Sequence, residues 1–294
     1  MNSDNEFFLN SFENNASKNM VSFYHCKDCD TSFYCNDLNG NSCIFCNGNN
    51  IEKLEEEKDN SIPIIPFVKS MDDAVDCYKR NIFWNPFIPL YFKRKKNYQN
   101  FKKVYVPCYL LDANVAGNIY YRAMDKHTNG EAYDVALQTN FDYNQLVLKK
   151  CSLFSDSLFE SIGIIDLKNL VDCDASLLRE TYIIKDNLSY LDVSSKLRDQ
   201  IMDKSIKMSE DGVLHSQKVV KKNDLEIFFH NMKEVLVPIY YLKIIYHGKN
   251  NYYLMNGENG KCNYEIMNSK LGIVLFSIIV FLLLLLISYF VFFL

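Results

Sequence analysis

The chain has 294 residues, of which 48% are hydrophobic and 23% are charged, and its formal net charge is −4. This length allows one sizeable folded domain or two, and the slightly acidic balance excludes a chain whose overall charge would attract nucleic acid. The charge is unevenly spread: residues 1–60 hold eleven acidic residues against four lysines, whereas residues 61–110 hold nine basic residues against three acidic ones.

Residues 1–22 are predicted to form a disordered tail. Their opening sequence, MNSDNEFFLNSFENN, is acidic and lacks the apolar stretch of a secretory signal. We therefore expect no secretory signal at this end of the chain.

Five cysteines lie within the stretch CKDCDTSFYCNDLNGNSCIFC, which begins at residue 26. Four of them form two CxxC pairs, Cys26 with Cys29 and Cys43 with Cys46, separated by thirteen residues. Each CxxC turn supplies two thiolates, and two such turns complete the tetrahedral shell of zinc. The spacing predicts a zinc ribbon over residues 23–50 that binds one structural Zn²⁺ ion, with Gly48 in a left-handed turn after the second pair.

Two neighbours, Cys35 and His25, could replace a ligand, but the symmetrical spacing of the pairs favours leaving both outside the shell. A closed shell of four thiolates leaves no position for water or substrate, so we expect a structural ion rather than a catalytic one. The predicted ribbon has one lysine against three aspartates, which disfavours contact with a phosphate backbone. It would either dock a protein partner or simply stabilise a small fold.

Residues 51–62 (IEKLEEEKDNSI) are acidic and show no apolar periodicity, so they are predicted to form a loose linker. An α+β body is then expected over residues 63–268. Its first helix is predicted at about residues 71–84, with Ser70 as the N-cap and Asp73 at the third helical position.

A basic and aromatic segment runs from Lys93 to Lys103. Its basic residues are Lys93, Arg94, Lys95, Lys96, Lys102 and Lys103, and its aromatic neighbours are Tyr91, Phe92, Tyr98 and Phe101. Three interpretations stay open: a solvated surface with the aromatic rings turned to the core, a surface for anionic lipid headgroups, or a site for single-stranded nucleic acid.

Two stretches of the body echo each other, VYVPCYLL from residue 104 and VLVPIYYL from residue 235. Each is predicted to be the first strand of a hairpin that turns at a glycine, Gly117 or Gly248. Proline lacks the N–H that a sheet needs, so Pro107 and Pro238 are expected at edge positions. The body would then be an antiparallel, β-rich fold with two related hairpins.

The region between the two stretches is predicted to add a few more elements. We expect a strand over residues 131–150, a helix that Asp174 caps and that runs to Ile183, and a second helix around residues 193–201. A strand around residues 217–229 is expected to rejoin the sheet.

The last segment, from Leu271 to Leu294, has no charged residue. Twenty-four helical residues extend about 36 Å, enough to cross a hydrocarbon core of about 30 Å. We expect a single transmembrane helix that anchors the protein in the cell membrane by its tail. Lys261 and Lys270 precede the span, which favours a cytoplasmic body, and a reducing cytoplasm favours metal over disulfides at paired cysteines.

Together these features resemble the uncharacterised bacterial membrane proteins known as TFIIB-type zinc ribbon-containing proteins. The resemblance covers most of residues 23–268 and rests on the ribbon, the two VP strands, DANVAG at 112–117, NGENGK at 256–261 and the apolar tail. The knuckles of that family usually read CPxCG, whereas here they read CKDC and CIFCN. The resemblance implies a membrane-attached ribbon protein without an assigned activity.

The sequence contains no phosphate-binding loop, no GxSxG nucleophile turn and no HExxH zinc-protease motif, so we expect no enzyme. The remaining cysteines, Cys77, Cys108, Cys151, Cys173 and Cys262, are predicted to be small buried apolar residues. The expected function is that of a tail-anchored scaffold or adaptor whose ribbon recruits a protein partner. The alternative is a membrane-tethered protein that binds nucleic acid through the segment from Lys93 to Lys103.

Overall fold

The computed structural model describes residues 21–35, 38, 42–58, 62–124, 132–163, 167–173, 177–185, 187–210 and 217–293. Residues 1–20 of the expected disordered tail lie outside the described residues, whereas residues 21 and 22 belong to the first strand. The fold is α+β and rich in β-structure, as the sequence predicts.

Within the described residues, ten strands form one sheet. They are β1 (Val21–Cys26), β2 (Thr31–Cys35), β3 (Ile51–Lys58), β4 (Lys102–Met124), β5 (Ala132–Lys149), β6 (Tyr182–Ile184), β7 (Gln217–Asn223), β8 (Glu226–Tyr246), β9 (Lys249–Asn256) and β10 (Cys262–Glu265). Across the sheet they follow the order β10-β9-β8-β4-β6-β2-β1-β3, and β5 and β7 also pair with β4. All these pairings are antiparallel except that of β4 with β6.

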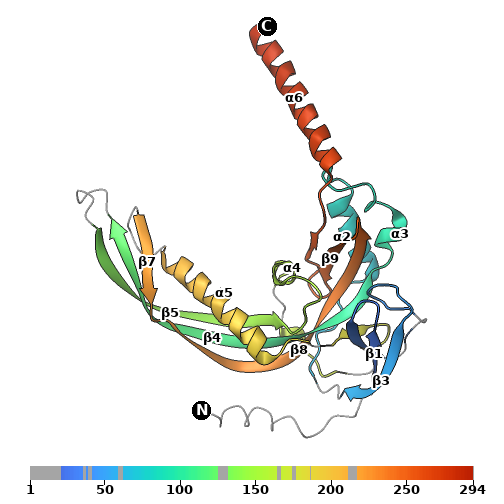
Figure 1. Cartoon of the computed structure of the whole chain (residues 1–294), viewed down its shortest axis with the longest axis horizontal. Coiled ribbons are helices and arrows are strands. Elements are labelled where there is room, and N and C mark those ends of the chain that lie inside the picture. The colour runs from blue at the N-terminus through green and yellow to red at the C-terminus, as the bar shows by residue number, and fades with distance from the viewer. Residues whose placement is uncertain are drawn as a thin grey trace.

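The described part of the chain also contains five α-helices and one short 3₁₀ helix. They are α2 (Met71–Ile82), α3 (Lys95–Tyr98), α4 (Asp156–Ser161), η2 (Leu167–Asn169), α5 (Tyr190–Glu210) and α6 (Lys270–Phe293). Three long strands, β4, β5 and β8, sweep across the molecule as a curved band, and α5 lies along one face of that band (Figure 1). One end of the band carries β7, and the other end carries β1, β3, α2 and α3, from which α6 projects (Figure 1).

The two echoing apolar stretches form the central strands of the sheet, β4 and β8, which pair with each other. Their side chains are buried on both faces: Val104 and Val106 pack into one core cluster, whereas Tyr105 packs into another on the opposite side. A strand that is covered on both faces needs apolar residues at every position rather than at alternate ones. This double burial explains why both stretches are almost continuously apolar.

The expected edge positions of the two prolines are wrong, because both residues lie in central strands. Each proline is tolerated because its backbone faces a place where one neighbouring strand ends. The carbonyl of Pro107 accepts a hydrogen bond from the Lys150 N–H just beyond β5, and that of Pro238 accepts one from the Gly257 N–H just beyond β9. No regular ladder bond is therefore lost at either proline.

Gly117 does not turn the chain, and the two related hairpins are not confirmed. Gly248 does lie in the β8–β9 turn, with a φ of +71°, but Gly117 lies inside β4 with a φ of +147°. At this point the partner of β4 changes from β8 to β7, and a Cβ atom on Gly117 would lie 2.4 Å from the carbonyl oxygen of Asp224. Glycine is needed here for this close approach of two backbones.

Two further expectations are wrong. The acidic residues 51–58 form strand β3, which pairs with β1, because a partner edge satisfies their backbone groups whatever the charge on their side chains. The expected helix that ends at Ile183 is instead a turn over residues 177–180 followed by strand β6, and its expected cap, Asp174, falls outside the described residues.

Other elements confirm the expectations. Helix α2 begins at the predicted N-cap, where the Ser70 hydroxyl accepts a hydrogen bond from the Asp73 N–H and the Asp73 carboxylate accepts one from the Ser70 N–H. Strand β5 and helix α5 lie where they are predicted, although α5 continues to Glu210. Helix α6 is long and apolar enough to cross a membrane, and none of its most apolar window, Gly272–Tyr289, is buried against the rest of the protein.

Candidate metal centre

The four predicted ligands come from two tight turns at one end of the sheet. Cys26 ends β1, and Cys29 lies in the turn that leads into β2. Cys43 and Cys46 occupy a second turn, which is closed by hydrogen bonds from the Cys43 N–H to the Gly48 carbonyl and from the Asn47 N–H to the Cys43 carbonyl. Backbone hydrogen bonds therefore shape the turn that holds the second pair.

The left-handed residue of the second turn is Asn47, with a φ of +61°, and not Gly48 as expected. Gly48 is required for another reason, because a Cβ atom there would lie 2.0 Å from the Asp28 carboxylate oxygen. The two turns thus pack closely against each other. The N–H of Asn50 also donates a hydrogen bond to Asp28, at 3.3 Å.

All four sulfur atoms lie within 4.8 Å of one another. The Cys26 and Cys46 sulfurs are 3.6 Å apart, and those of Cys29 and Cys43 are 3.7 Å apart. Each pair therefore joins one turn to the other, as the four corners of a single coordination shell require. The cluster fits one structural metal ion.

The surroundings of the Cys43 and Cys46 sulfurs act on the thiols in two opposite ways: nearby backbone N–H groups favour the thiolate, and burial disfavours it. The Phe45 N–H lies 3.4 Å from the Cys43 sulfur, and the Gly48 N–H lies 3.3 Å from the Cys46 sulfur. Burial raises the pKa of the Cys43 thiol well above its usual value and raises the pKa of Cys46 to about 11. Without a cation these thiols would stay protonated at neutral pH, so binding of an ion must displace protons.

Cys29 has a different electrostatic environment. Burial alone would raise the pKa of its thiol, but hydrogen bonds with Thr31 and Cys46 outweigh burial and lower the pKa. This sulfur lies 3.4 Å from the Thr31 hydroxyl. The Cys29 thiol therefore ionises more easily than the thiols of Cys43 and Cys46.

The two neighbouring candidates stay outside the cluster, as the spacing predicts. The ring of His25 contacts the Ser32 hydroxyl at 2.9 Å through Nδ1 and the Asp30 carboxylate at 3.5 Å through Nε2. Cys35, at the end of β2, is buried, and the group of potential metal ligands within the described residues does not include it.

The four-cysteine region, which comprises residues 21–58, is part of the main sheet rather than a separate unit. Strand β2 pairs with β6 of the body. The buried Phe33 ring meets Tyr182 edge-on at 6.0 Å, and the ring of Phe45, between the second pair of cysteines, meets Tyr241 of β8 edge-on at 5.6 Å. The metal centre and the central strands therefore share one apolar core.

No protein-family model, curated protein or solved structure matches this chain. The resemblance to zinc ribbon-containing membrane proteins therefore stays a prediction.

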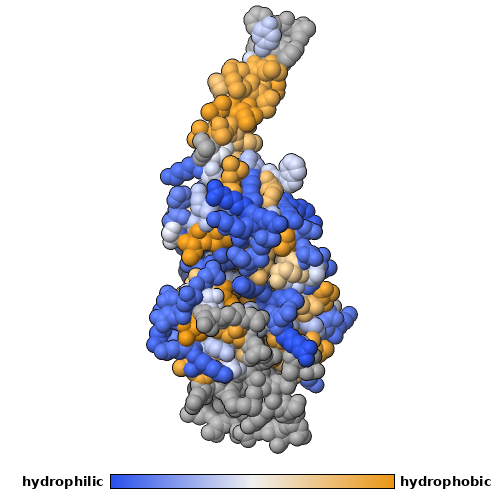
Figure 2. Space-filling view, turned by 90° about the vertical axis from the view of Figure 1, so that its right-hand side faces the viewer, coloured by the Kyte–Doolittle hydropathy of each residue, from blue (hydrophilic) through white to orange (hydrophobic). Residues whose placement is uncertain are grey.

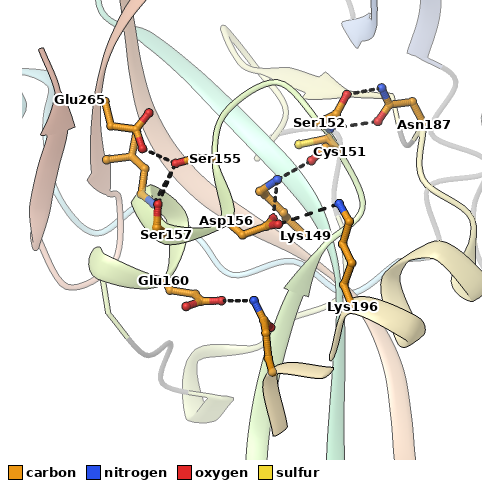
Figure 3. Close-up of polar contacts among 12 residues, drawn as sticks. Lys149, Cys151, Ser152, Ser155, Asp156, Ser157, Glu160, Asn187, Lys196 and Glu265 are labelled. Atoms are coloured by element: carbon orange, nitrogen blue, oxygen red, sulfur yellow. Dashed lines mark hydrogen bonds and ion pairs between the residues drawn. The ribbon is translucent and has the colours of Figure 1, made fainter. Parts of the chain in front are cut away.

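A second cluster of polar groups lies where β5 meets α4 (Figure 3). The ammonium group of Lys149, whose side chain is only 5% exposed, contacts the Asp156 carboxylate at 2.7 Å and the Cys151 carbonyl at 2.8 Å. Lys196 of α5 lies 4.0 Å from the same carboxylate. Figure 3 shows Lys149 and Lys196 converging on Asp156 from two elements.

This arrangement is that of a structural ion pair. Two of the three donors of Lys149 are occupied by a carboxylate and a carbonyl, and its ammonium lies 5.6 Å from the centre of the Phe154 ring. The neighbouring Cys151 thiol is buried, and burial raises its pKa to about 11, so it is a poor nucleophile. The cluster attaches the loop before α4 to the sheet.

The aromatic residues of the basic segment face the core. Phe92 and Phe101 are buried, Tyr91 stacks on Tyr246 at 5.0 Å, and Tyr98 stacks on Tyr78 at 5.8 Å. The interpretation with rings turned inward is thus confirmed for the aromatic half of the pattern. The neighbouring cations of α3 remain exposed.

Two cysteines that were expected to be small buried apolar residues are instead bonded to each other. Cys77 of α2 and Cys262 of β10 form a disulfide over a separation of 185 residues. The four cysteines of the metal centre form no disulfide. Sequence spacing could not reveal this pair, because the two residues meet only once α2 packs on the far strands of the sheet.

Proposed function

We propose that this protein is a membrane-anchored adaptor, which holds one structural Zn²⁺ ion and recruits a protein partner through its four-cysteine region. The observation that carries this proposal is that the closed set of four thiols lies in the same sheet whose last strand, β10, leads into the exposed apolar helix α6. A closed shell offers no position for a substrate, so its use is to fix a surface. The sheet couples that surface to the anchor.

The distances support zinc as the ion. A tetrahedral ion with bonds of about 2.3 Å places its sulfur ligands about 3.8 Å apart. The separation of the Cys26 and Cys46 sulfurs, 3.6 Å, and that of the Cys29 and Cys43 sulfurs, 3.7 Å, lie close to this value. Elemental analysis of the purified protein should find one zinc per chain, the double variant Cys43→Ser/Cys46→Ser should lose it, and Cys35→Ser should keep it.

Helix α6 supports the anchor. Its most apolar window, Gly272–Tyr289, has a mean hydropathy of 2.9 and is not buried in the protein. Figure 2 shows it as an apolar column that stands on a mostly hydrophilic body. Leaving so much apolar surface in water is strongly unfavourable, and a bilayer removes it from water. The proposed anchor is thus a single C-terminal span from Leu271 to Leu294.

The exposed surface of the metal centre supports a partner with basic groups. Asp28 and Asp30 project from the first turn, and Asp30 is 94% exposed. The nearest lysine, Lys27, is already paired with Glu52. This acidic surface would repel a phosphate backbone and attract a basic protein surface.

Affinity capture of the full-length protein from detergent-solubilised membranes tests the adaptor. The informative variant is Asp28→Asn/Asp30→Asn, because amides keep the shape of the turns and remove only their charge. The matched control, Asp199→Asn/Asp203→Asn, changes two exposed residues of α5. A partner lost from the first variant and kept by the control supports the proposal, and an identical set of proteins from all three samples refutes it.

Binding of nucleic acid is the second candidate, and the structure offers it less support. Stacking of bases needs exposed aromatic faces, whereas the rings around Lys93–Lys103 are engaged in the core. Nucleic acid measured in the same eluates decides the matter. If it is present near physiological salt and is lost on Lys95→Ala/Lys96→Ala, this alternative replaces the adaptor.

We propose that the body faces the cytoplasm, since the four cysteines of the metal centre must be reduced to bind an ion and form no disulfide. The disulfide between Cys77 and Cys262 points the other way, because such bonds persist mainly in oxidising compartments. Cys46 is partly exposed and suits a labelling test in intact cells. After removal of metal by a permeant chelator, modification of Cys46 by an impermeant maleimide before lysis would refute the cytoplasmic orientation.

A further inference from the structure

The loop of residues 83–90, between α2 and α3, lies against the start of α6. The Phe87 ring meets the Phe276 ring edge-on at 5.0 Å, and the Ser269 N–H donates a hydrogen bond to the Phe87 carbonyl at 2.6 Å. A Cβ atom on Gly272 would lie only 2.3 Å from the Pro86 carbonyl oxygen. Phe276 belongs to the stretch that is apolar enough to span a membrane, so any bilayer around α6 reaches this loop.

The same loop exposes large apolar side chains. In addition to the exposed apolar residues of α6, Trp84 is 89% exposed and Leu90 is 78% exposed. The loop is nevertheless held in shape, because the ammonium of Lys93 donates hydrogen bonds to the carbonyls of Phe83 and Asn85. A rigid loop that presents a tryptophan and a leucine to solvent, beside a span, has the composition of a membrane–water interface.

Three cations lie next to these apolar residues. Arg94, Lys95 and Lys96 are exposed, and none of them forms an ion pair within the described residues. No acidic residue occurs in the sequence between Asp76 and Asp112 that could neutralise them. Hydrophilic side chains gather directly beneath the apolar helix in Figure 2.

We propose that the surface formed by residues 83–96, the interface platform, binds the headgroup region of an anionic bilayer around α6. Trp84 and Leu90 enter the boundary between headgroups and acyl chains, and Arg94, Lys95 and Lys96 contact lipid phosphates. This proposal rests on the membrane anchor proposed above. It adds a second, charge-selective contact, which would set the tilt of the body on the membrane and favour anionic lipid.

The protein carries its own probe, because Trp84 is the only tryptophan of the chain. The full-length protein would be reconstituted into vesicles of phosphatidylcholine, with and without phosphatidylglycerol. Fluorescence of Trp84 would then be recorded with acrylamide in the water and with lipids brominated near the headgroup end. Shielding from acrylamide and quenching by bromine, both stronger with phosphatidylglycerol, are the expected results.

Two variants test the contacts that carry the proposal. Arg94→Ala/Lys95→Ala/Lys96→Ala should lower the ratio of docked to undocked platform in anionic vesicles roughly a hundredfold, since each cation near such a surface contributes roughly fivefold. Gly272→Val should displace the Pro86 carbonyl and reduce bromine quenching while the span remains inserted. The matched control, Lys196→Ala/Lys204→Ala/Lys207→Ala, removes three exposed lysines of α5 and should change nothing.

Insertion of α6 is scored separately, by flotation of the vesicles after an alkaline wash. If the protein floats but Trp84 stays open to acrylamide and unquenched by bromine, the platform is overturned and the anchor stands. If the protein is washed off, the anchor fails and the platform fails with it. If Trp84 stays in water and single-stranded RNA binds through Arg94, Lys95 and Lys96, the surface serves nucleic acid and the lipid proposal is overturned.

Discussion

Replacing Phe45 by alanine tests whether the metal centre and the sheet form one cooperative unit. Phe45 lies between the ligands Cys43 and Cys46, is 4% exposed, and meets the rings of Phe33 and Tyr241 edge-on at 5.6 Å each. The substitution leaves all four ligands in place. It removes the side chain that joins the second metal-binding turn to the central strand β8.

The expected loss of stability follows from burial. Truncating a fully buried phenylalanine to alanine costs about 3–5 kcal/mol, and two edge-on ring contacts account for about 0.5–1.5 kcal/mol each within that loss. We expect Phe45→Ala to lower the free energy of unfolding of the whole protein by about 4 kcal/mol. With a dependence of the free energy of unfolding on urea of about 1–3 kcal/mol per molar, the midpoint should fall by roughly 1.3–4 M.

Urea unfolding of the full-length protein in detergent, followed by far-ultraviolet circular dichroism, measures this change, and a chromophoric chelator reports release of metal in the same samples. Phe228→Ala is the matched control, because Phe228 lies on β8 but is 56% exposed. A loss below about 1 kcal/mol for Phe45→Ala would refute the shared core, as would release of metal with no shift of the main transition. If Phe45→Ala does not fold, Phe45→Leu keeps an apolar side chain and should show a smaller loss in the same direction.

Three further predictions follow from other contacts. Gly117→Ala should lower the free energy of unfolding by about 2 kcal/mol or more, because the new Cβ would meet the Asp224 carbonyl. Gly248→Ala should lower it by about 1 kcal/mol, because only its left-handed φ is unfavourable. Equal losses of stability in thermal unfolding would contradict the close approach at Gly117. Asp156→Asn should lower the free energy of unfolding by about 2 kcal/mol, because it leaves the buried Lys149 without its partner; the loss is smaller than the roughly 3–5 kcal/mol of a fully buried pair, because Asp156 is itself 41% exposed. Lys149→Met should lower it by less, because it removes the buried charge as well, and the reverse order in urea unfolding would contradict the ion pair. Four aspartates have a pKa below the ordinary value: Asp73 by hydrogen bonds from Ser70, Asp112 by those from Asn231 and Gln145, Asp134 by Lys221, and Asp192 by those from Ser189. A carboxylate with a lowered pKa stabilises the fold above the pKa of the unfolded chain, so the free energy of unfolding should be constant near neutral pH and decline as the pH falls below about 4; a titration of stability that stays flat down to the acid limit of the folded protein would contradict these shifts.

Some features of this protein were readable from the sequence because they are local. The four ligands Cys26, Cys29, Cys43 and Cys46 come together as the spacing predicts, since each pair belongs to one tight turn. The N-cap of α2 was readable for the same reason, because its hydrogen bonds connect residues three apart. The helix at the C-terminus needed only length and uniform apolarity.

Other features depend on which segments meet, and local patterns carry no record of that. The acidic residues Ile51–Lys58 looked like a linker by charge and became a strand because the edge of β1 was available to them. Gly117 was predicted to form a turn, but it lies within β4 at the point where the pairing partner of that strand changes from β8 to β7. In both cases the decisive partner is a backbone from another part of the chain.

The sequence by itself therefore determined the ligand set, the apolar span and the β-rich class, because short-range spacing and composition suffice for each. Only the tertiary structure decided that the metal centre shares a core with Tyr241, that Cys77 meets Cys262, and that the loop of Trp84 lies beside α6. These contacts join residues that lie far apart in the sequence. They form because the folded sheet brings distant segments together, where burying their apolar side chains against one another is favourable.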